Sequence, residues 1–494
     1  MFEKSVNSEP RIAVPQWSRA DTLLICGLLL AGFVTIFWRL GTPSVMVFDE
    51  DLTVPWARAY LEGIPYNRIH HPPLPVLLIS LAIRIFGDWA SSWRLPGATL
   101  GVSLVVITYL LGRRMFGSRL AATLAAMLLL CSGLFLVHSR VAFHEIFYLT
   151  FAALSYLMLF RFAQNPDHRS QRRILVGMGV ALGLCLGSKL LIPGVTELLV
   201  LGFLEFLLVR PATHGVSNPR PGSGDRRMLA LKLGGSLALV GGLSALVYEA
   251  AFLPNYWFGW WRGIGDQLAY HILIYRRDIN VGAHGHPYDS PWWSWPLMLR
   301  PILYWHNSEF FPNRPIAEIM ALANPVICWS VLAAISLLAV REGARRSVAG
   351  AFIVVGYVLY LAMWIPITHY KFVYHYMPAL YLGLLALADL LAECWESKRK
   401  GWEHAALLLS LAPAALLGFG MTLGLVVAVA MVLSYTALRW FDSGLAGRFV
   451  CALFVLAIFV AFAYFFPIWT GLPISPSGFR ARMWLHGPGL ANWM

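Results

Sequence analysis

Apolar runs of about twenty residues recur along almost the whole chain, and each is long enough to cross a bilayer as one α-helix. Hydrophobic residues make up 58% of the 494 residues and charged residues 13%, which excludes a soluble domain with a polar shell. The sequence therefore predicts an all-α, polytopic membrane protein with about 11–13 transmembrane helices. The expected spans lie near residues 22–40, 95–112, 119–137, 142–160, 174–190, 193–209, 230–252, 320–340, 348–366, 372–392, 403–418, 420–437 and 449–467.

Basic residues predict the orientation of these spans. Lys4, Arg11 and Arg19 precede the first run, which has no small-residue cleavage site, so we expect a retained helix with a cytoplasmic N-terminus. The basic clusters at 113–119 and 161–173 then also face the cytoplasm, which explains the net charge of +13 without a nucleic-acid partner. The predicted organisation is a cytoplasmic N-terminus at 1–21, an N-terminal transmembrane catalytic module at 22–252 with a first acidic loop at 41–94, an extracytoplasmic loop at 253–317 and a C-terminal transmembrane module at 318–494.

Three consecutive carboxylates, Asp49, Glu50 and Asp51, follow the first span immediately, on the predicted outer face. Carboxylates at a membrane edge are costly to hold there and are usually functional, although three acids beside a span are also typical of a solvated loop. A His-His-Pro-Pro corner that begins at His70 comes about two dozen residues later. This stretch is the first candidate for a site.

Other polar residues that interrupt the apolar runs fall on the same predicted face. Each has a structural alternative: Arg140 and Lys189 could reach up to lipid headgroups, the aromatic residues of 286–305 are typical of an interfacial belt, and Lys371 could be a flanking charge. The residues that gather on this face are His71, His138, Arg140, His144, Glu145, Lys189, His284, His286, Tyr288, Arg300, His369, Lys371 and His375.

The histidines and cysteines do not predict a metal site. Neither the pair His284 and His286 nor the pair at 70–71 has a helical i, i+4 relation to a carboxylate. The six cysteines lie singly and mostly within spans, so a disulfide framework is not expected either. The sequence therefore predicts a site without a metal or another cofactor.

Several short motifs resemble those of the protein O-mannosyltransferases, which are C-type glycosyltransferases that use a polyprenyl-phosphate sugar. They run in family order from about residue 40 to 390, and the HPY-to-RP block is the most specific of them. The motifs are FDE at 48–50, HPPL at 71–74, FG at 86–87, WRLPGA at 93–98, RRMFGS at 113–118, SR at 139–140, HPYDSPWWSWPLMLRP at 286–301, NPVICW at 324–329 and KFVYHYMPAL at 371–380.

This resemblance implies transfer of mannose from polyprenyl-phosphate-mannose to Ser or Thr hydroxyls of exported proteins, with inversion at the anomeric carbon. By position it implies that Asp49 is the catalytic aspartate, Glu50 its acidic neighbour and Arg140 the basic residue near the donor phosphate. The chain departs from the family in having HHPPLP for HPPLGK, Glu145 where aspartate is common, and no room in 253–317 for the β-trefoil domain of the eukaryotic enzymes. The last departure fits a bacterial member in the inner (plasma) membrane, and together they leave the sugar and the acceptor open.

The chemistry of the residues agrees with this expectation. A carboxylate at a partly dehydrated membrane edge has a raised proton affinity, which suits a general base, and fixed cations would stabilise the leaving phosphate without a metal. The lipid tail of the donor is expected in a groove between helices. The predicted roles are catalysis by Asp49 and Glu50, donor phosphate or lipid binding by Arg140, Lys189, Arg300 and Lys371, and acceptor or sugar binding by His71, Glu145, His286 and Tyr288.

Two other classes of function remain open from the sequence. A C-type transferase that moves another sugar from a polyprenyl-phosphate donor to a lipid or glycan would keep the acidic loop and the cations. A transporter or flippase should instead place charges near mid-membrane and have paired broken helices, whereas the charges here gather at one edge and no internal repeat is evident.

Overall fold

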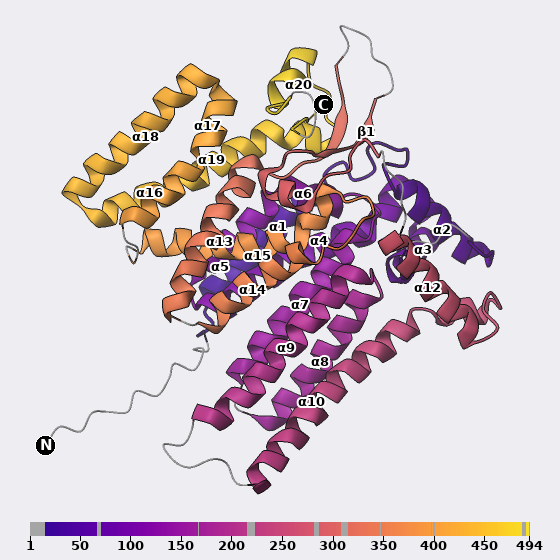
Figure 1. Ribbon diagram of the computed structural model, residues 1–494. Helices are drawn as coiled ribbons and strands as arrows, with labels where there is room; N and C mark the ends of the chain where they lie inside the picture. Colours follow the sequence, from indigo (N-terminus) through magenta and orange to yellow (C-terminus); the bar gives the residue numbers. More distant parts are fainter. Residues whose placement is uncertain are drawn as a thin grey trace, which may run out of the picture.

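The computed structural model describes residues 15–66, 71–165, 167–214, 223–280, 286–307, 315–345, 347–396, 398, 401–486 and 491–493. Within these ranges the chain is almost entirely helical, as expected (Figure 1). The helices are α1 (Arg19–Phe37), α2 (Glu50–Glu62), α3 (Leu74–Phe86), α4 (Ala90–Phe116), α5 (Arg119–Leu130), α6 (Gly133–Ser139), α7 (Glu145–Gln164), α8 (His168–Leu186), α9 (Leu191–His214), α10 (Ser223–Ala250), α11 (Leu253–Trp257), α12 (Ile264–Asn280), α13 (Pro325–Arg345), α14 (Val348–Ala362), α15 (Met377–Trp395), α16 (Gly401–Ser410), α17 (Ala412–Phe419), α18 (Met421–Phe441), α19 (Ser443–Thr470) and α20 (Pro476–Arg482).

Ten helical segments in the described part of the chain are long and apolar enough to cross a membrane. The number becomes 11 if α5 and α6, which meet at a bend of 65°, count as one broken span. This confirms the polytopic helical membrane fold and lowers the expected number of spans. Two predicted spans account for the difference: α14 has only 15 residues, and α8 begins with the polar sequence HRSQRR, which leaves a short apolar part.

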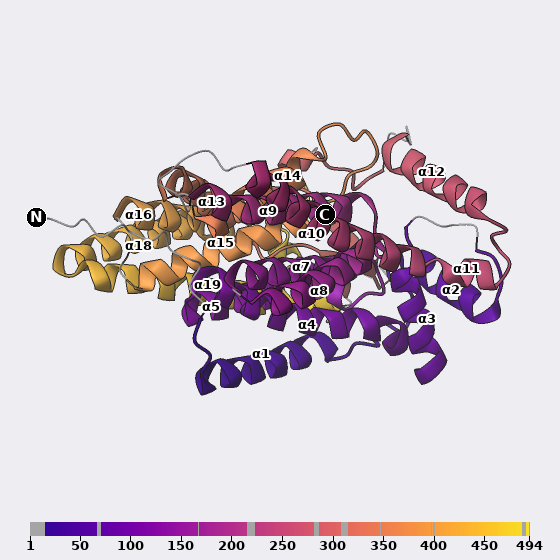
Figure 2. The same cartoon turned by 90° about the horizontal axis from the view of Figure 1, so that it is seen from below.

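The centre of the bundle is α15, which is buried along nearly its whole length among α5, α13, α14 and α19. By contrast, α10 and α18 expose apolar side chains along most of their length, which is the surface that lipid chains require of a spanning helix. Figure 2 shows the long helices running side by side, with α2, α3, α11 and α12 gathered at one end of the molecule. The first acidic loop, between α1 and α4, lies at this end.

Residues 253–317 were expected to form an extracytoplasmic loop, and much of the segment contains regular secondary structure. It contains α11, α12, the 3₁₀ helix η1 (Trp292–Leu297) and the strand β1 (Ile302–His306). Strand β1 pairs antiparallel with β2 (Glu318–Ala321), with Ile302 opposite Ala321 and His306 opposite Glu318. Alternating burial along β1 explains why this short apolar stretch is a strand beside the helical bundle.

Candidate functional site

The backbone at the start of α2 leaves the carboxylate of Asp49 available. Asp49 is the N-cap residue of α2, yet its side chain makes no capping hydrogen bond to the helix. Phe48, immediately before it, has φ of 51°, a left-handed conformation that is a true outlier for a bulky residue. The chain therefore turns sharply just before the helix, and the half-buried Asp49 side chain lines a cavity.

This cavity has a volume of about 340 Å³, which lies in the range of small-molecule sites. Segments far apart in the sequence meet around it: α2, the α6–α7 turn, the break between α8 and α9, and the segment between α14 and α15. The lining side chains are Asp49, Leu52, Thr53, Trp56, His71, Phe143, His144, Lys189, Leu191, Ile192, Trp364, His369, Tyr370, Phe372, Tyr374 and His375.

The surroundings of Asp49 favour its protonated form. Removal from water, together with repulsion from Glu145 and Asp51, raises the pKa of Asp49 to about 7, and the attraction of Lys189 opposes this rise. A carboxylate with such a pKa accepts a proton far more readily at neutral pH than an exposed aspartate does. The site therefore has a candidate general base.

Lys189 is the candidate cation of the cavity. It sits at the break between α8 and α9, where its Nζ donates a 2.7 Å hydrogen bond to Oε1 of Glu145. Both side chains are buried, and Lys189 also lies over the rings of Tyr148 and Tyr374, 5.9 and 5.6 Å from their centroids. Lys189 lines the cavity and Glu145 does not, so Glu145 holds the ammonium group from the side that faces away from the cavity.

Glu50 is fully buried and does not line the cavity. Its Oε1 and Oε2 accept hydrogen bonds of 2.8 Å each from Nε and Nη2 of Arg94. The backbone N–H groups of Ala142 and Val47 add bonds of 2.8 and 2.9 Å. These four donors satisfy the carboxylate, which leaves no lone pair for a substrate. The geometry therefore indicates that Glu50 fixes the turn between α1 and α2.

Arg94 was not among the predicted site residues. Its Nη1 donates to the carbonyl oxygens of Leu40 and Pro43 at 3.1 and 2.8 Å, and its Nη2 donates to that of Val45 at 3.0 Å. The guanidinium therefore fixes the loop that leads to Asp49. The available signal was an arginine inside the apolar run of α4, within the WRLPGA motif, because such a charge needs partners when buried.

Arg140 faces the end of α1. Its Nη1 donates to the carbonyl oxygens of Ile36 and Trp38, each at 2.7 Å, which satisfies acceptors at a helix C-terminus. Burial and the nearby guanidiniums of Arg94 and Arg39 lower the pKa of Arg140 to about 10, so it stays charged at neutral pH. Arg140 does not line the cavity.

Arg300 and Lys371 also lie outside the cavity lining. Lys371 bridges two segments: its Nζ donates to the carbonyl of Ile367 at 2.6 Å, and its N–H donates to Asp289 at 2.7 Å. Arg300 donates from Nε to the carbonyl of Pro287 at 2.7 Å. The bond to Asp289 fastens the loop around 287–289 to the segment that carries the lining residues 369–375, and the bond from Arg300 ties the same loop to the end of η1.

His286 and Tyr288 form a second layer behind the aromatic wall. The His286 ring lies 4.8 Å from that of Phe372 and 5.3 Å from that of Tyr370, both of which line the cavity. His71, in contrast, lines the cavity directly, with its ring 4.8 Å from that of His144. Of the residues given a predicted role, the structure thus brings Asp49, His71 and Lys189 to one cavity, and His144, His369 and His375 of the predicted face also line it. His70 and His284 lie outside the described residues.

The lining also includes aromatic residues that the sequence reasoning did not single out. Trp56 on α2 and Trp364 at the end of α14 are both nearly fully buried. Their rings, together with the tyrosines and phenylalanines, offer flat apolar faces to a bound group. Their only sequence signal was the general abundance of aromatic residues, which is equally typical of a membrane interface.

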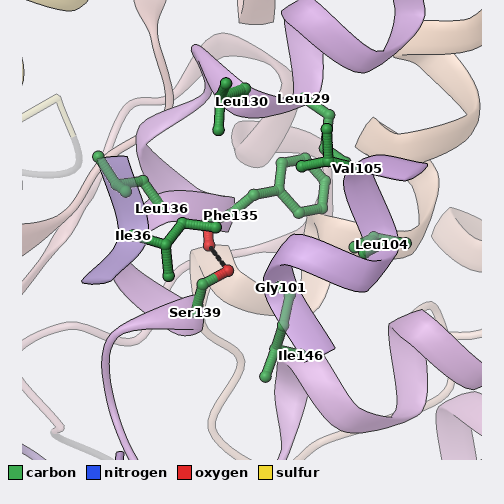
Figure 3. A pocket seen from close by; sticks show the side chains of 10 residues that line it. All are labelled: Ile36, Gly101, Leu104, Val105, Leu129, Leu130, Phe135, Leu136, Ser139 and Ile146. Atoms are coloured by element: carbon green, nitrogen blue, oxygen red, sulfur yellow. Dashed lines mark hydrogen bonds between the residues drawn. The ribbon is translucent and has the colours of Figure 1, made fainter. Parts of the chain in front are cut away.

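A second, much smaller cavity lies between α1, α4, α5, α6 and α7 (Figure 3). Its volume is about 10 Å³ and its lining is almost wholly apolar. Ser139 points toward it, but the hydroxyl already donates to the carbonyl of Phe135 at 2.6 Å. This space is a packing gap too small for a substrate.

Among the described residues, no group of three or more His, Cys, Asp or Glu side chains could hold a metal ion. The expectation of a site without a metal stays a prediction, because two of the site histidines lie outside those residues.

Two family models match the chain on either side of residues 222–264. The model described as "Dolichyl-phosphate-mannose-protein mannosyltransferase" matches residues 70–221. The model described as "C-terminal four TMM region of protein-O-mannosyltransferase" matches residues 265–487. The two matched regions together contribute most of the segments that line the cavity.

Full-length relatives and solved structures agree with these matches. The chain is 25% identical to the polyprenol-phosphate-mannose--protein mannosyltransferase of Mycobacterium tuberculosis, over 97% of this chain and 95% of the relative. It is also 25% identical to the enzyme of the same name from Corynebacterium glutamicum, over 77% and 84%.

Among solved structures, it resembles the Saccharomyces cerevisiae protein O-mannosyltransferase Pmt1-Pmt2 complex bound to the sugar donor, with a TM-score of 0.74, 14% identity and coverage of 97% and 93%. It also resembles ArnT from Cupriavidus metallidurans bound to undecaprenyl phosphate, with a TM-score of 0.55, 14% identity and coverage of 90% and 77%. The fold is that of the C-type glycosyltransferases, and this chain belongs to the protein O-mannosyltransferase family.

Proposed function

We propose that this protein is a polyprenol-phosphate-mannose--protein mannosyltransferase that transfers mannose to Ser or Thr hydroxyls of exported proteins. The relatives carry this activity in their names. The observation that supports it within the molecule is the placing of Asp49 and Lys189 in the wall of one cavity, because transfer from a sugar phosphate needs a base and a cation.

Asp49 takes the proton of the acceptor hydroxyl as that oxygen attacks the anomeric carbon of mannose. The bond that breaks is the one from the anomeric carbon to the phosphate oxygen, and polyprenyl phosphate leaves with the electron pair. Attack from the face opposite the phosphate inverts the anomeric configuration. The raised pKa of Asp49 supports this role, because a base is most effective when its pKa is close to the working pH.

Lys189 stabilises the charge that develops on the leaving phosphate. Its ammonium group has three donors, of which one is directed at Glu145. The buried setting strengthens a charge-assisted hydrogen bond to phosphate, and Glu145 keeps the ammonium group in place. Arg140, Arg300 and Lys371 then act on the loops around the cavity, in accordance with their backbone contacts.

The proposed site lies on the outer face of the inner (plasma) membrane. The basic residues that follow the spans at 113–119 and 161–173 support a cytoplasmic position for the opposite ends of these helices. Cysteine labelling at Ser308 in intact cells tests this orientation. Ser308 lies outside the described residues, so His306 on β1 is a second position for the label. Labelling of both positions only after permeabilisation contradicts the proposal.

A single-turnover assay tests the proposed activity. Purified protein in detergent is mixed with polyprenyl-phosphate-mannose and a Ser/Thr peptide, with polyprenyl-phosphate-glucose as the matched donor and a lipid or glycan as the matched acceptor. We expect transfer of mannose to the peptide, and we expect it to survive exhaustive chelation of divalent cations. Transfer only to the lipid or glycan, or only from the other donor, contradicts the proposed activity and indicates another C-type transferase.

A further inference from the structure

The residue before the proposed base has an unfavourable backbone conformation. Phe48 adopts φ of 51°, which glycine tolerates and a phenylalanine does not adopt without strain. Such a conformation persists only where the surrounding structure holds it, and residues of this kind cluster at functional sites. The contacts of Phe48 therefore identify what fixes the direction of Asp49.

The strand β1 supplies the main contacts. The N–H of Phe48 donates to the carbonyl oxygen of Tyr304 at 3.2 Å. The two rings stack almost parallel, with centroids 4.1 Å apart and planes 5° apart. Phe48 is thus held by the backbone and by the side chain of one residue, which lies more than 250 positions later in the chain. The edges of the ring meet Phe143 and Tyr374, at 5.9 and 6.2 Å, and both of these line the cavity.

Tyr304 is itself fixed from the other side. Its hydroxyl lies 2.8 Å from Nε2 of His138, whose Nδ1 lies 2.7 Å from the carbonyl oxygen of Leu134. Because a carbonyl can only accept, Nδ1 donates, and Nε2 of the neutral ring then accepts from the tyrosine. Both Tyr304 and His138 are buried. The chain of contacts runs from the backbone of α6 through two rings to Phe48.

We propose that Tyr304 clamps Phe48 and thereby directs the carboxylate of Asp49 into the cavity, which makes Tyr304 a positioning residue for the transfer reaction. The inference rests on the proposed role of Asp49 as the base. It assigns the hairpin of β1 and β2, in the C-terminal part of the chain, a direct part in orienting a group from the first loop.

The test compares Tyr304→Phe with Tyr304→Leu. Phenylalanine keeps the stacked ring and the backbone acceptor and loses only the bond to His138, so we expect turnover within about threefold of that of the unmodified protein. Leucine removes the stack, and we expect turnover to fall by about ten- to hundredfold, as for a misplaced catalytic group. Donor affinity should stay unchanged in both, because Tyr304 does not line the cavity.

The pH profile separates positioning from a general loss of structure. Release of Phe48 in Tyr304→Leu should let water reach Asp49, so the acid limb of turnover should move to lower pH. The matched controls are Tyr381→Phe and Tyr381→Leu, at a buried tyrosine that bonds Thr108 and has no ring contact with Phe48 among the described residues. We expect neither control to move the acid limb.

Two results overturn the inference. The first is full turnover by folded Tyr304→Leu. The second is a Tyr304→Leu variant in which donor affinity falls together with turnover while the acid limb stays at the same pH. Asp49→Asn is measured in the same assay. If Asp49→Asn transfers mannose normally, the proposed base has failed, whereas an inactive Asp49→Asn beside a fully active Tyr304→Leu contradicts the clamp alone.

Discussion

Two aspartates at opposite ends of α1 illustrate two uses of a carboxylate in this membrane protein. Asp21, in the first turn of α1, is fully buried and accepts from Arg113 at 2.6 Å, Arg119 at 3.0 Å and Tyr109 at 2.8 Å. Asp49, beyond the other end, accepts no hydrogen bond on its carboxylate from the part of the chain that the structure describes. The arginines neutralise the carboxylate at the first end, whereas the carboxylate at the second end has no such partner among the described residues.

The comparison also explains why burial alone does not identify a site. Glu50 is more deeply buried than Asp49, but Arg94 and two backbone N–H groups satisfy it, as the arginines satisfy Asp21. An acidic residue with a full set of donors stabilises the fold, and changing it should affect folding first. An acidic residue that faces a cavity without such donors has an altered proton affinity and should affect the reaction first.

The largest effect should come from Asp49→Asn. The amide keeps the size of the side chain but accepts no proton, so turnover should fall by about 10²- to 10⁴-fold, as for a lost general base. Single-turnover transfer from polyprenyl-phosphate-mannose measures this, with Asp51→Asn as the neighbouring control that should change turnover much less. If folded Asp49→Asn binds the donor and transfers mannose at a near-normal rate, another residue is the base, and Asp49 and Asp21 do not differ in function.

Loss of the cavity cation should have the next largest effect. Lys189→Met should lower kcat/KM for the donor by about 10- to 100-fold, in proportion to about 1.5–3 kcal/mol for a hydrogen bond to a charged group. The single variant leaves Glu145 buried without its cation, so the double variant Lys189→Met with Glu145→Gln is the control. If the double variant regains normal donor use, the defect comes from the unpaired glutamate and Lys189 does not bind the phosphate.

Arg140→Ala provides the corresponding contrast among cations. Its contacts with the last carbonyls of α1 predict a lower thermal stability, while the resemblance to the family predicts weaker donor use. Thermal unfolding and donor kinetics on the same preparation decide between the two. Normal donor kinetics with a lowered unfolding temperature assign Arg140 to the fold.

The pH dependence should be smaller and graded. The proposed base, Asp49, would act in its deprotonated form, and its raised pKa of about 7 means that this form is lost as the pH falls through neutrality. The value of kcat/KM should therefore rise between about pH 5 and 8 and fall about tenfold per unit well below 7. An acid limb near pH 4, the usual range of an exposed aspartate, contradicts the proposed environment of Asp49.

The smallest effect on the reaction should follow from Asp21→Asn. This change weakens the ion pairs with Arg113 and Arg119, so the thermal unfolding temperature should fall, while turnover per folded molecule stays normal. Thermal unfolding in detergent and active-site-normalised turnover measure the two quantities. A large loss of turnover with stability intact would show that the two ends of α1 are coupled.

The fold class and the position of Asp49 at a cavity could be predicted from the sequence because both have local signals. The apolar runs give the spans, and the FDE motif marks Asp49. The direction in which a cation points could not be predicted in this way. An isolated Arg or Lys at a membrane edge gives the same sequence pattern whether its side chain faces a cavity or a carbonyl oxygen. Arg300 and Lys371 were predicted at the phosphate. In the structure each donates a bond to a backbone oxygen and neither lines the cavity, whereas Lys189 does.

Partners that are distant in the chain explain the residues that the sequence did not reveal. Arg94 is 44 positions from Glu50, and Tyr304 is 256 positions from Phe48. Neither pairing has a periodicity that a single sequence displays. The number of spans, 10 or up to 11, lies at the low end of the expectation because the apolar stretches of α8 and α14 are short, although both helices pack within the bundle.

The bonds of Arg94 and Glu50 also set an order of assembly. The loop before Asp49 needs the guanidinium of Arg94, which lies on α4. Glu50 also needs the N–H of Ala142, which follows the broken span of α5 and α6. During synthesis the first loop is therefore outside the bilayer well before the groups that shape it have arrived. Until then its three acids remain hydrated, so the loop that carries the proposed base takes its final form only after the neighbouring helices have been inserted. A chain halted between α4 and α6 should carry an accessible, unfolded acidic loop.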